Sequence, residues 1–237
     1  MKPDRVEKHT IADLIRSNAK KFDGCPHRII VGIPDDSARD AIKKKEDFIY
    51  IDHAYFNRGW HEGNFRAVRS EVHLTEIKPR PTDRVKHMGV RIDPWRKRGK
   101  EIIIIPPSER QVALYGIPNW LIETESKLCQ ITDRPVVVKN RKTTKLKDFC
   151  FDAWAVVTYA SVAGVEAAFM GIPVFSTTRC PSWPVNSGPL EQIETPTYSD
   201  ARLELAASLS YASWNIKDIY KVQWKGYDYS RRIDSPQ

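Results

Sequence analysis

The amino-acid sequence predicts an α/β fold built on a parallel β-sheet. Beyond residue 100, short and continuously apolar segments alternate with helical segments. Strands that are apolar at successive positions are buried on both faces, which is typical of parallel sheets covered by helices. The predicted strands are Ile102–Ile105, Pro135–Val138, Ala155–Tyr159 and Pro173–Ser176. The predicted helices are Pro118–Cys129, a short helix from Thr143 or Thr144 to Phe149, Val162–Met170, Asp200–Tyr211, and Ile216–Val222 capped by Asn215.

The first hundred residues predict a smaller α/β arrangement. Thr10 is placed to cap a helix over Ile11–Lys21. A second strand–helix–strand unit follows, and its predicted elements are Arg28–Ile33, Ser37–Lys45 and Phe48–Asp52.

Polar and aromatic residues follow that last strand. Asp52 and His53 come at its end, and the stretch Tyr55–Val72 interleaves aromatic residues with arginines. Such a stretch can stack rings and bind phosphates, or it can be a packed irregular loop with solvated arginines. The candidate binding residues are Tyr55, Arg58, Arg66 and Arg69.

The chain is predicted to have two domains, residues 1–95 and 96–237. Glu76–Lys100 contains several prolines and no sustained periodicity, so it is interpreted as a linker with the boundary near Asp93. Residues 1–100 hold 23 Lys and Arg against 15 Asp and Glu, and the remainder is neutral. The basic portion either faces an acidic partner or is simply a solvated surface.

Several protein classes are not supported. No apolar run approaches the roughly 20 residues of a membrane span, and the N-terminus lacks the apolar core of a signal peptide. The four cysteines are widely spaced, so neither a zinc site nor a disulfide framework is expected. Gly-rich dinucleotide and P-loop motifs are absent. We expect a cytoplasmic protein, in the host cytoplasm if it is viral.

The stretch Trp154–Thr177 carries the strongest functional signal. It predicts a strand, a loop containing Ser161, a small-residue helix and a second strand. The loop places a hydroxyl and backbone N–H groups at a helix N-terminus, where anions bind well.

Other polar residues are expected at the same edge of the sheet. Open parallel sheets bind ligands at the carboxyl ends of their strands. Cations and hydroxyls that converge there form a plausible diphosphate or nucleotide site, and Glu166 could accept hydrogen bonds from a ribose. The expected residues are Ser108, Lys139, Arg141, Tyr159, Ser161, Ser176 and Thr177.

The second portion resembles the nucleotide-binding half of GT-B glycosyltransferases, near the capsule polysaccharide biosynthesis or Kdo-transferase-like group. The resemblance implies a Rossmann-like domain that binds a nucleotide-sugar donor, with no metal and no other cofactor. It implies that Ser161 contacts the donor phosphate and that Gly164 and Glu166 shape the donor pocket. The matching segments are Ile105–Ser108, Trp120-Leu121, Arg134–Lys139, Val156–Ser161, Gly164–Ala167, Gly171–Phe175, Ile193–Pro196 and Leu209–Trp214.

Two departures from this family pattern affect the expected chemistry. The family places a His-Pro pair after the third strand of this half, where this chain has Lys139–Lys142. Residues 1–95 would form only a reduced acceptor domain. Asp52, with His53 as the alternate, occupies the place of the family's candidate base. The glycine that usually follows that residue in the family is absent from this chain.

The sequence thus predicts a metal-independent, glycosyltransferase-like enzyme. The donor would bind to residues 101–220, and a basic acceptor face would suit an acidic glycan or a modified DNA base. The alternatives are a sugar-nucleotide epimerase and a non-catalytic protein that binds nucleotide sugar or nucleic acid.

Overall fold

A computed structural model describes residues 28–32, 36–44, 46–58, 63–139, 146–148 and 150–215. The chain divides into two compact units, unit 1 (Met1–Val72 with Tyr211–Gln237) and unit 2 (His73–Ser210). The predicted helices Ile11–Lys21 and Ile216–Val222 lie outside the described residues. The observed division differs from the expected boundary near residue 95, because residues 73–95 belong to unit 2 and Tyr211–Asn215 return to unit 1.

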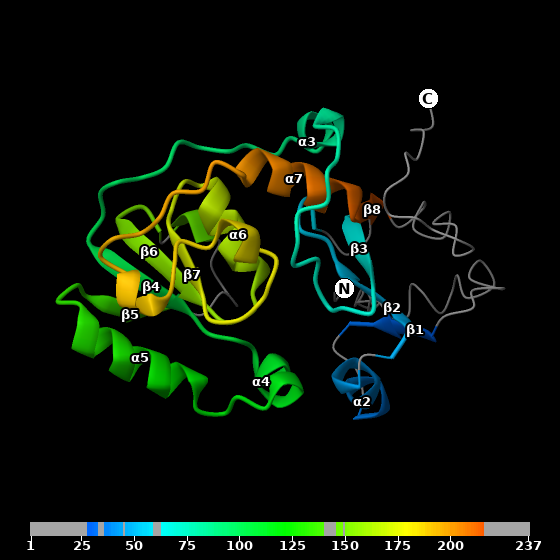
Figure 1. The fold of residues 1–237 in the computed structure, drawn as a ribbon, viewed down its shortest axis with the longest axis horizontal. Coiled ribbons are helices and arrows are strands. Elements are labelled where there is room, and N and C mark those ends of the chain that lie inside the picture. Colours follow the sequence, from blue (N-terminus) through cyan, green and yellow to red (C-terminus); the bar gives the residue numbers. More distant parts are fainter. Residues whose placement is uncertain are drawn as a thin grey trace, which may run out of the picture. The chain divides into compact units, whose positions relative to one another are not determined.

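Unit 2 contains a four-stranded sheet in which every pairing is parallel, as predicted (Figure 1). Runs of isoleucine, valine and alanine form its two central strands, and nearly all of these side chains are buried. Strands buried on both faces favour this composition. In sheet order the strands are β5 (Val136–Val138), β4 (Glu101–Ile105), β6 (Ala153–Thr158) and β7 (Val174–Ser176).

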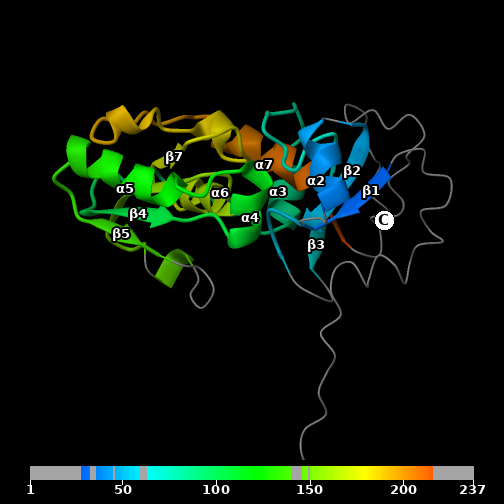
Figure 2. The same cartoon turned by 90° about the horizontal axis from the view of Figure 1, so that it is seen from below.

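The helices of unit 2 follow the predicted alternation, with two additions. The sequence did not predict α3, which lies in the segment interpreted as a linker, or α4, which follows Pro106 and Pro107. Figure 2 shows α5 running alongside β4 and β5. The helices are α3 (Asp83–His87), α4 (Glu109–Tyr115), α5 (Trp120–Ile131), α6 (Val162–Phe169) and α7 (Arg202–Tyr211), with the 3₁₀ turns η2 (Leu146–Asp148), η3 (Trp183–Val185) and η4 (Leu190–Gln192).

The segment interpreted as a linker is instead packed along unit 2. We call residues 91–100 the strap. Because extended backbone can donate hydrogen bonds at every residue except proline, the prolines do not prevent this packing. Its backbone N–H groups donate to backbone carbonyls, Asp93 to Phe169 at 2.7 Å, Arg96 to Gly171 at 2.6 Å and Lys100 to Asp152 at 2.8 Å.

The outer edge of β7 is covered by the loop that follows it. The N–H of Ser187 donates to the carbonyl of Val174 at 2.7 Å, and the N–H of Ser176 donates to Oδ1 of Asn186 at 2.7 Å. An exposed strand edge is a template for unwanted pairing. The loop therefore closes this side of the sheet.

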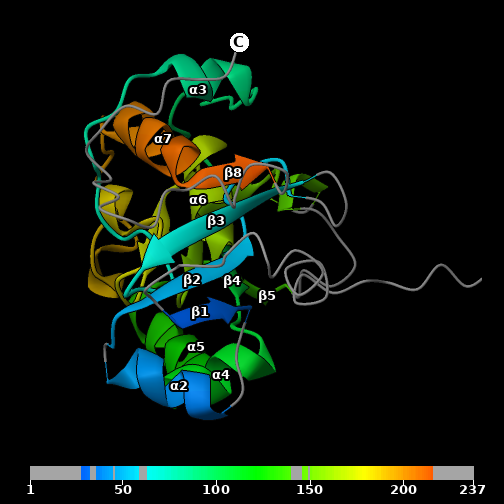
Figure 3. The same cartoon turned by 90° about the vertical axis from the view of Figure 1, so that its right-hand side faces the viewer.

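Unit 1 contains a mixed four-stranded sheet, which Figure 3 shows with its strands side by side. β1 and β2 are parallel, as expected for the predicted strand–helix–strand unit, and the other two pairings are antiparallel. The elements are β1 (Arg28–Val31), α2 (Asp36–Lys43), β2 (Phe48–His53), β3 (Asn64–Arg69) and β8 (Ser213–Asn215).

Unit 1 contains two strands that the sequence did not predict. Part of the stretch Tyr55–Val72 forms β3, and Asn215, predicted to cap a helix, is the last residue of β8; the helix that it would cap lies outside the described residues. Phe65 of β3 pairs with Trp214 of β8, and both side chains are buried. A partner almost 150 residues away is not visible in local sequence pattern.

None of the helices among the described residues has the length and apolar character that a membrane crossing requires.

We predict that Gly171→Ala destabilises the protein much more than Gly89→Ala. Both glycines have positive φ, +76° and +62°, so both substitutions strain the backbone by about 1–2 kcal/mol. A Cβ at Gly89 meets no atom within 4 Å, whereas one at Gly171 collides with the Pro94 carbonyl of the strap. Overpacking adds about 1–3 kcal/mol. Urea denaturation measures both losses, and equal losses would contradict close packing of the strap.

Candidate functional site

The carboxyl ends of β4 and β6 form the point where strand order reverses in unit 2. The chain leaves β4 toward β5 on one side and leaves β6 toward β7 on the other. Open α/β sheets bind ligands at such a point. Two loops begin here, the Ser108 loop (Pro106–Ser108) and the Ser161 loop (Tyr159–Ser161). The strand ends are tied together, since Oγ1 of Thr158 donates to the carbonyl of Ile105 at 3.2 Å.

Ser161 is the N-cap of α6. Its backbone is extended, and its Oγ accepts a hydrogen bond from the N–H of Ala163 at 3.1 Å. Because Oγ is the acceptor in this hydrogen bond, the hydroxyl group can still donate its hydrogen to an anionic ligand. The N-terminus of α6 also carries a partial positive charge. Ser161 thus lies where the sequence predicted an anion-binding group.

Ser108 is the N-cap of α4 and belongs to a reciprocal capping box. Its Oγ accepts from the N–H of Gln111 at 3.3 Å, and Oε1 of Gln111 accepts from the N–H of Ser108 at 2.9 Å. Capping of α4 is a sufficient structural reason for a serine at this position. Ser108 remains a candidate site residue because it follows β4, the strand next to β6 and its Ser161 loop.

Tyr159 belongs to an aromatic cluster at the same edge. Its ring centre lies 5.2 Å from that of Tyr115 and 5.9 Å from that of Trp120. Nε1 of Trp120 donates to Oγ1 of Thr177 at 2.7 Å, which links the cluster to the end of β7. The cluster fixes the first residue of the Ser161 loop. Ser176 is buried, and its Oγ lies 2.9 Å from that of Ser182.

Gly164 is explained by packing within unit 2. A Cβ at this position would collide with Oγ of Ser182, a fully buried side chain in the loop after β7. Any larger residue would therefore push α6 away from that loop. Glu166 lies less than two turns after Ser161 on the same helix and is half-buried.

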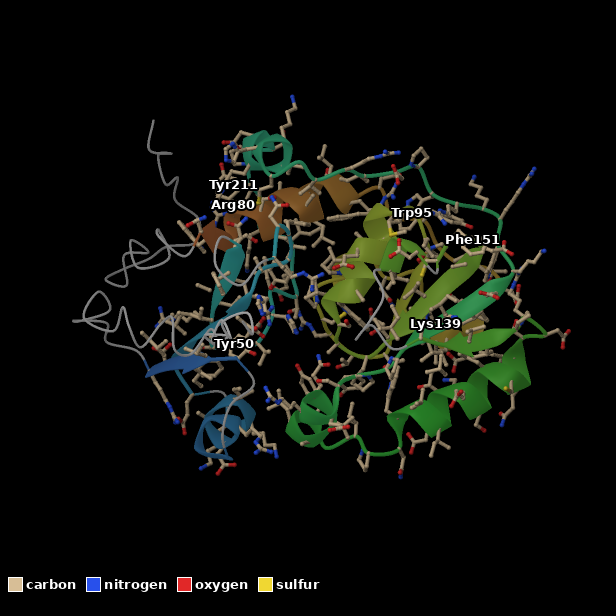
Figure 4. All side chains as sticks on the ribbon, turned by 180° about the vertical axis from the view of Figure 1, so that it is seen from behind. Tyr50, Arg80, Trp95, Lys139, Phe151 and Tyr211 are labelled. Atoms are coloured by element: carbon tan, nitrogen blue, oxygen red, sulfur yellow. The ribbon has the colours of Figure 1, made fainter. Side chains whose placement is uncertain are left out.

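Lys139 directly follows β5, next to β4 in the sheet, and Figure 4 labels it. Its N–H donates to the carbonyl of Ile104 at 2.9 Å, so the ladder holds its backbone at the carboxyl edge. Arg141 lies outside the described residues.

The candidate base Asp52 is the counter-ion of a buried arginine in unit 1. Its Oδ2 lies 3.1 Å from Nη2 of Arg66 and accepts from the hydroxyl of Tyr50 at 3.0 Å. Its Oδ1 accepts from the N–H of His53 at 2.7 Å. Both carboxylate oxygens are thus engaged within the unit.

Arg66, predicted to bind an acceptor, is a core residue of unit 1 with only 4% of its surface exposed. Its Nε donates to the carbonyl of Val72 at 3.1 Å, and its Nη1 donates to that of His53. Its Cζ lies 5.4 Å and 5.6 Å from the ring centres of Tyr50 and Tyr55. Tyr55 is also buried. Neither Arg66 nor Tyr55 is placed to meet a ligand in solvent.

The other two predicted arginines, Arg58 and Arg69, are exposed. Arg69 forms a bidentate pair with Asp47, whose two oxygens lie 2.8 Å from its Nε and Nη2.

His53 is half-buried and stacks on Phe65 with ring centres 5.9 Å apart. Burial lowers the pKa of His53 below its ordinary value of 6.5. The Asp52 carboxylate opposes this shift, and Arg58 and Arg66 add to it. The neutral imidazole is therefore favoured near pH 7, and a neutral imidazole can accept a proton.

No group of three His, Cys, Asp or Glu side chains within the described ranges is arranged to hold a metal ion. The expectation of metal-independent chemistry remains a prediction.

One segment of the family resemblance lies at the opposite end of the sheet. The carbonyl of Ile193 accepts from Nε1 of Trp154 at 2.7 Å, and Glu194 pairs with Nε of Arg134 at 2.9 Å. The Arg134 guanidinium lies 3.9 Å from the ring centre of Trp154. Trp154 is near the start of β6, so this cluster supports the amino end of the sheet.

The sequence prediction missed Gln111, which connects the two loops. Its Nε2 donates to the carbonyl of Ala160 in the Ser161 loop at 3.3 Å. The order Ser108-Glu109-Arg110-Gln111 is a capping-box pattern, so its local role could have been recognised.

No protein-family model matches this sequence, and a search of curated proteins gives no match. Among solved structures, the chain is similar to KpsC, a beta Kdo 2,4 transferase of Thermosulfurimonas dismutans, with a TM-score of 0.50 and 12% identity. The likeness is one of fold. The aligned part makes up 85% of this chain and 88% of that chain, so it extends beyond the residues of unit 2.

We predict that His53 makes the protein less stable as the pH falls from 7.5 to 5.5. Because its folded pKa lies below 6.5, the unfolded chain takes up the proton first, and stability present above pH 6.5 is lost below it. His53→Gln should reduce the pH dependence of the unfolding free energy, measured by urea denaturation. His87→Gln, at an exposed residue of α3, is the control and should leave it unchanged. Equal slopes for wild type and His53→Gln would contradict the prediction.

Proposed function

We propose that this chain is a glycosyltransferase-like enzyme of the GT-B type, in which unit 2 binds a nucleotide-sugar donor. The observation that carries the proposal is the position of the Ser161-capped helix α6 at the strand-order reversal. The fold likeness to a Kdo transferase supports it.

The donor phosphate would meet the N-terminus of α6. Backbone N–H groups, the Ser161 hydroxyl and the Lys139 ammonium would stabilise the negative charge on the leaving phosphate. The half-buried Glu166 would accept hydrogen bonds from the ribose. A metal ion is not required in this scheme, since fixed dipoles and a cation supply the stabilisation.

The acceptor would be acidic, either a glycan or a modified DNA base. Unit 1 supplies the exposed cations Arg58 and Arg69 for it. His53 replaces Asp52 as the proposed base, because Asp52 is engaged by three donors. In glycosyl transfer the acceptor hydroxyl gives its proton to a base as the hydroxyl oxygen bonds the anomeric carbon and the bond from that carbon to the phosphate oxygen breaks. The neutral imidazole of His53 has the chemistry of such a base.

The Asp52–Arg66 pair favours a second candidate, a protein that binds nucleotide sugar without transferring it. A carboxylate that neutralises a buried guanidinium has a structural role that requires no catalysis, because its removal would leave an unpaired charge in the core. An assay of sugar transfer by the wild type and by His53→Gln distinguishes the two. An enzyme should lose transfer by about 100-fold while binding the donor normally. A binding protein shows no transfer in the wild type.

We predict that Ser161→Ala weakens nucleotide binding and that Ser199→Ala does not. Each serine Oγ accepts the N–H two residues later, Ala163 at 3.1 Å and Ala201 at 3.2 Å, before a helix. Each substitution should therefore cost about 1 kcal/mol of stability. Only Ser161 would also contact the donor phosphate, and loss of one charge-assisted hydrogen bond weakens binding by about tenfold or more.

Thermal shift with CMP, UDP, GDP and their sugars identifies the ligand, because binding raises the melting temperature. Titration calorimetry of wild type and both serine variants then gives the dissociation constants. Equal affinities in Ser161→Ala and Ser199→Ala would refute the placement of the donor phosphate. Absence of any thermal shift in the wild type would refute the proposed donor class.

A further inference from the structure

We infer that Gln111 is a positioning residue that clamps the Ser161 loop to the start of α4. The inference rests on the proposed function only for the identity of the ligand. Gln111 makes contacts in two directions. Its Oε1 accepts from the N–H and the hydroxyl of Ser108, and its Nε2 donates to the carbonyl of Ala160.

The amide of Gln111 matches this position better than a carboxylate would. A capping box needs only an acceptor at this place, and glutamate serves it as well as glutamine. The second bond needs a donor, which glutamate lacks. The side chain is half-buried, and the Ala160 residue that it reaches is buried. The helix cap and the bridge between loops are therefore separable by substitution.

The bridge acts on the peptide unit directly before the helix. The carbonyl of Ala160 and the N–H of Ser161 belong to one planar trans peptide, so they point in opposite directions. Holding the carbonyl toward Gln111 fixes the direction of the Ser161 N–H. That N–H and the Ser161 side chain begin the proposed phosphate site.

Among the described residues, a hydrogen bond and a ring contact also connect these elements, and neither restrains this peptide. Thr158 bonds to Ile105 within the strand ends, and Tyr159 packs against Tyr115 through side chains. β6 ends at Thr158, so the sheet ladder does not hold Ala160. Gln111 is accordingly the restraint expected to determine the orientation of the Ala160–Ser161 peptide.

Two variants test the clamp. Gln111→Glu keeps the cap and removes the bridge, and Gln111→Met removes both. Gln130→Met, at an exposed position of α5, is the control. Hydrogen exchange of the full-length protein without ligand should be faster by about threefold to tenfold at Ser161–Ala163 in both Gln111 variants, since one hydrogen bond contributes about 0.5–1.5 kcal/mol. Gln111→Glu, which keeps the cap, should lower the melting temperature less than Gln111→Met, and Gln130→Met should behave as wild type.

Titration with CMP, UDP and GDP completes the test. For each of these nucleotides that binds the wild type, the dissociation constant should rise by about threefold to tenfold in Gln111→Met. This variant is used because methionine, unlike glutamate, adds no charge that could repel the phosphate. Unchanged exchange at Ser161–Ala163 in both variants would overturn the clamp. Faster exchange with unchanged affinity would overturn the positioning role. If the wild type binds none of the three, the proposed function fails, and faster exchange would still support the clamp.

Discussion

The parallel pairing of β4 with β6 is the contact on which unit 2 depends. Ile102–Ile105 pair with Ala155–Thr158 in continuous register, and these side chains are almost completely buried. Pairing of these two strands brings the Ser108 and Ser161 loops together, because β5 and β7 add on opposite sides. The candidate site is thus a consequence of strand order. Its loops require only the capping residues that their helices need anyway.

Much of unit 2 is predictable from the sequence, because its strands are apolar at most successive positions and its helices follow at short distances. Ser161 and Ser108 are recognisable for a related reason, since a hydroxyl before a helix is a local signal. The strap is not predictable in this way. Its sequence, which contains Pro94 and lacks apolar periodicity, resembles that of a linker, and the carbonyls that accept its backbone hydrogen bonds lie in distant segments, on Phe169, Gly171 and Asp152.

Unit 1 shows why polar site residues are harder to predict. The sequence selects Asp52 as a candidate base and Arg66 as a candidate binding residue, but composition does not reveal that the two side chains form an ion pair. β3 is buried at four successive positions, Phe65–Val68, and one of these buried residues is a charged arginine, which sequence pattern assigns to the surface. A buried arginine therefore concealed both the strand and the ion pair.

The return of the chain to unit 1 through β8 affects the order in which the protein can be completed. β3 is synthesised early, yet its partner β8 follows only after all of unit 2. At roughly 5–20 residues per second, the nascent β3 would wait roughly 7–30 s for this neighbour. During that interval one edge of β3 lacks its native strand, and such an edge can pair with other chains. Unit 2, by contrast, is continuous in sequence, and its sheet needs no strand from unit 1.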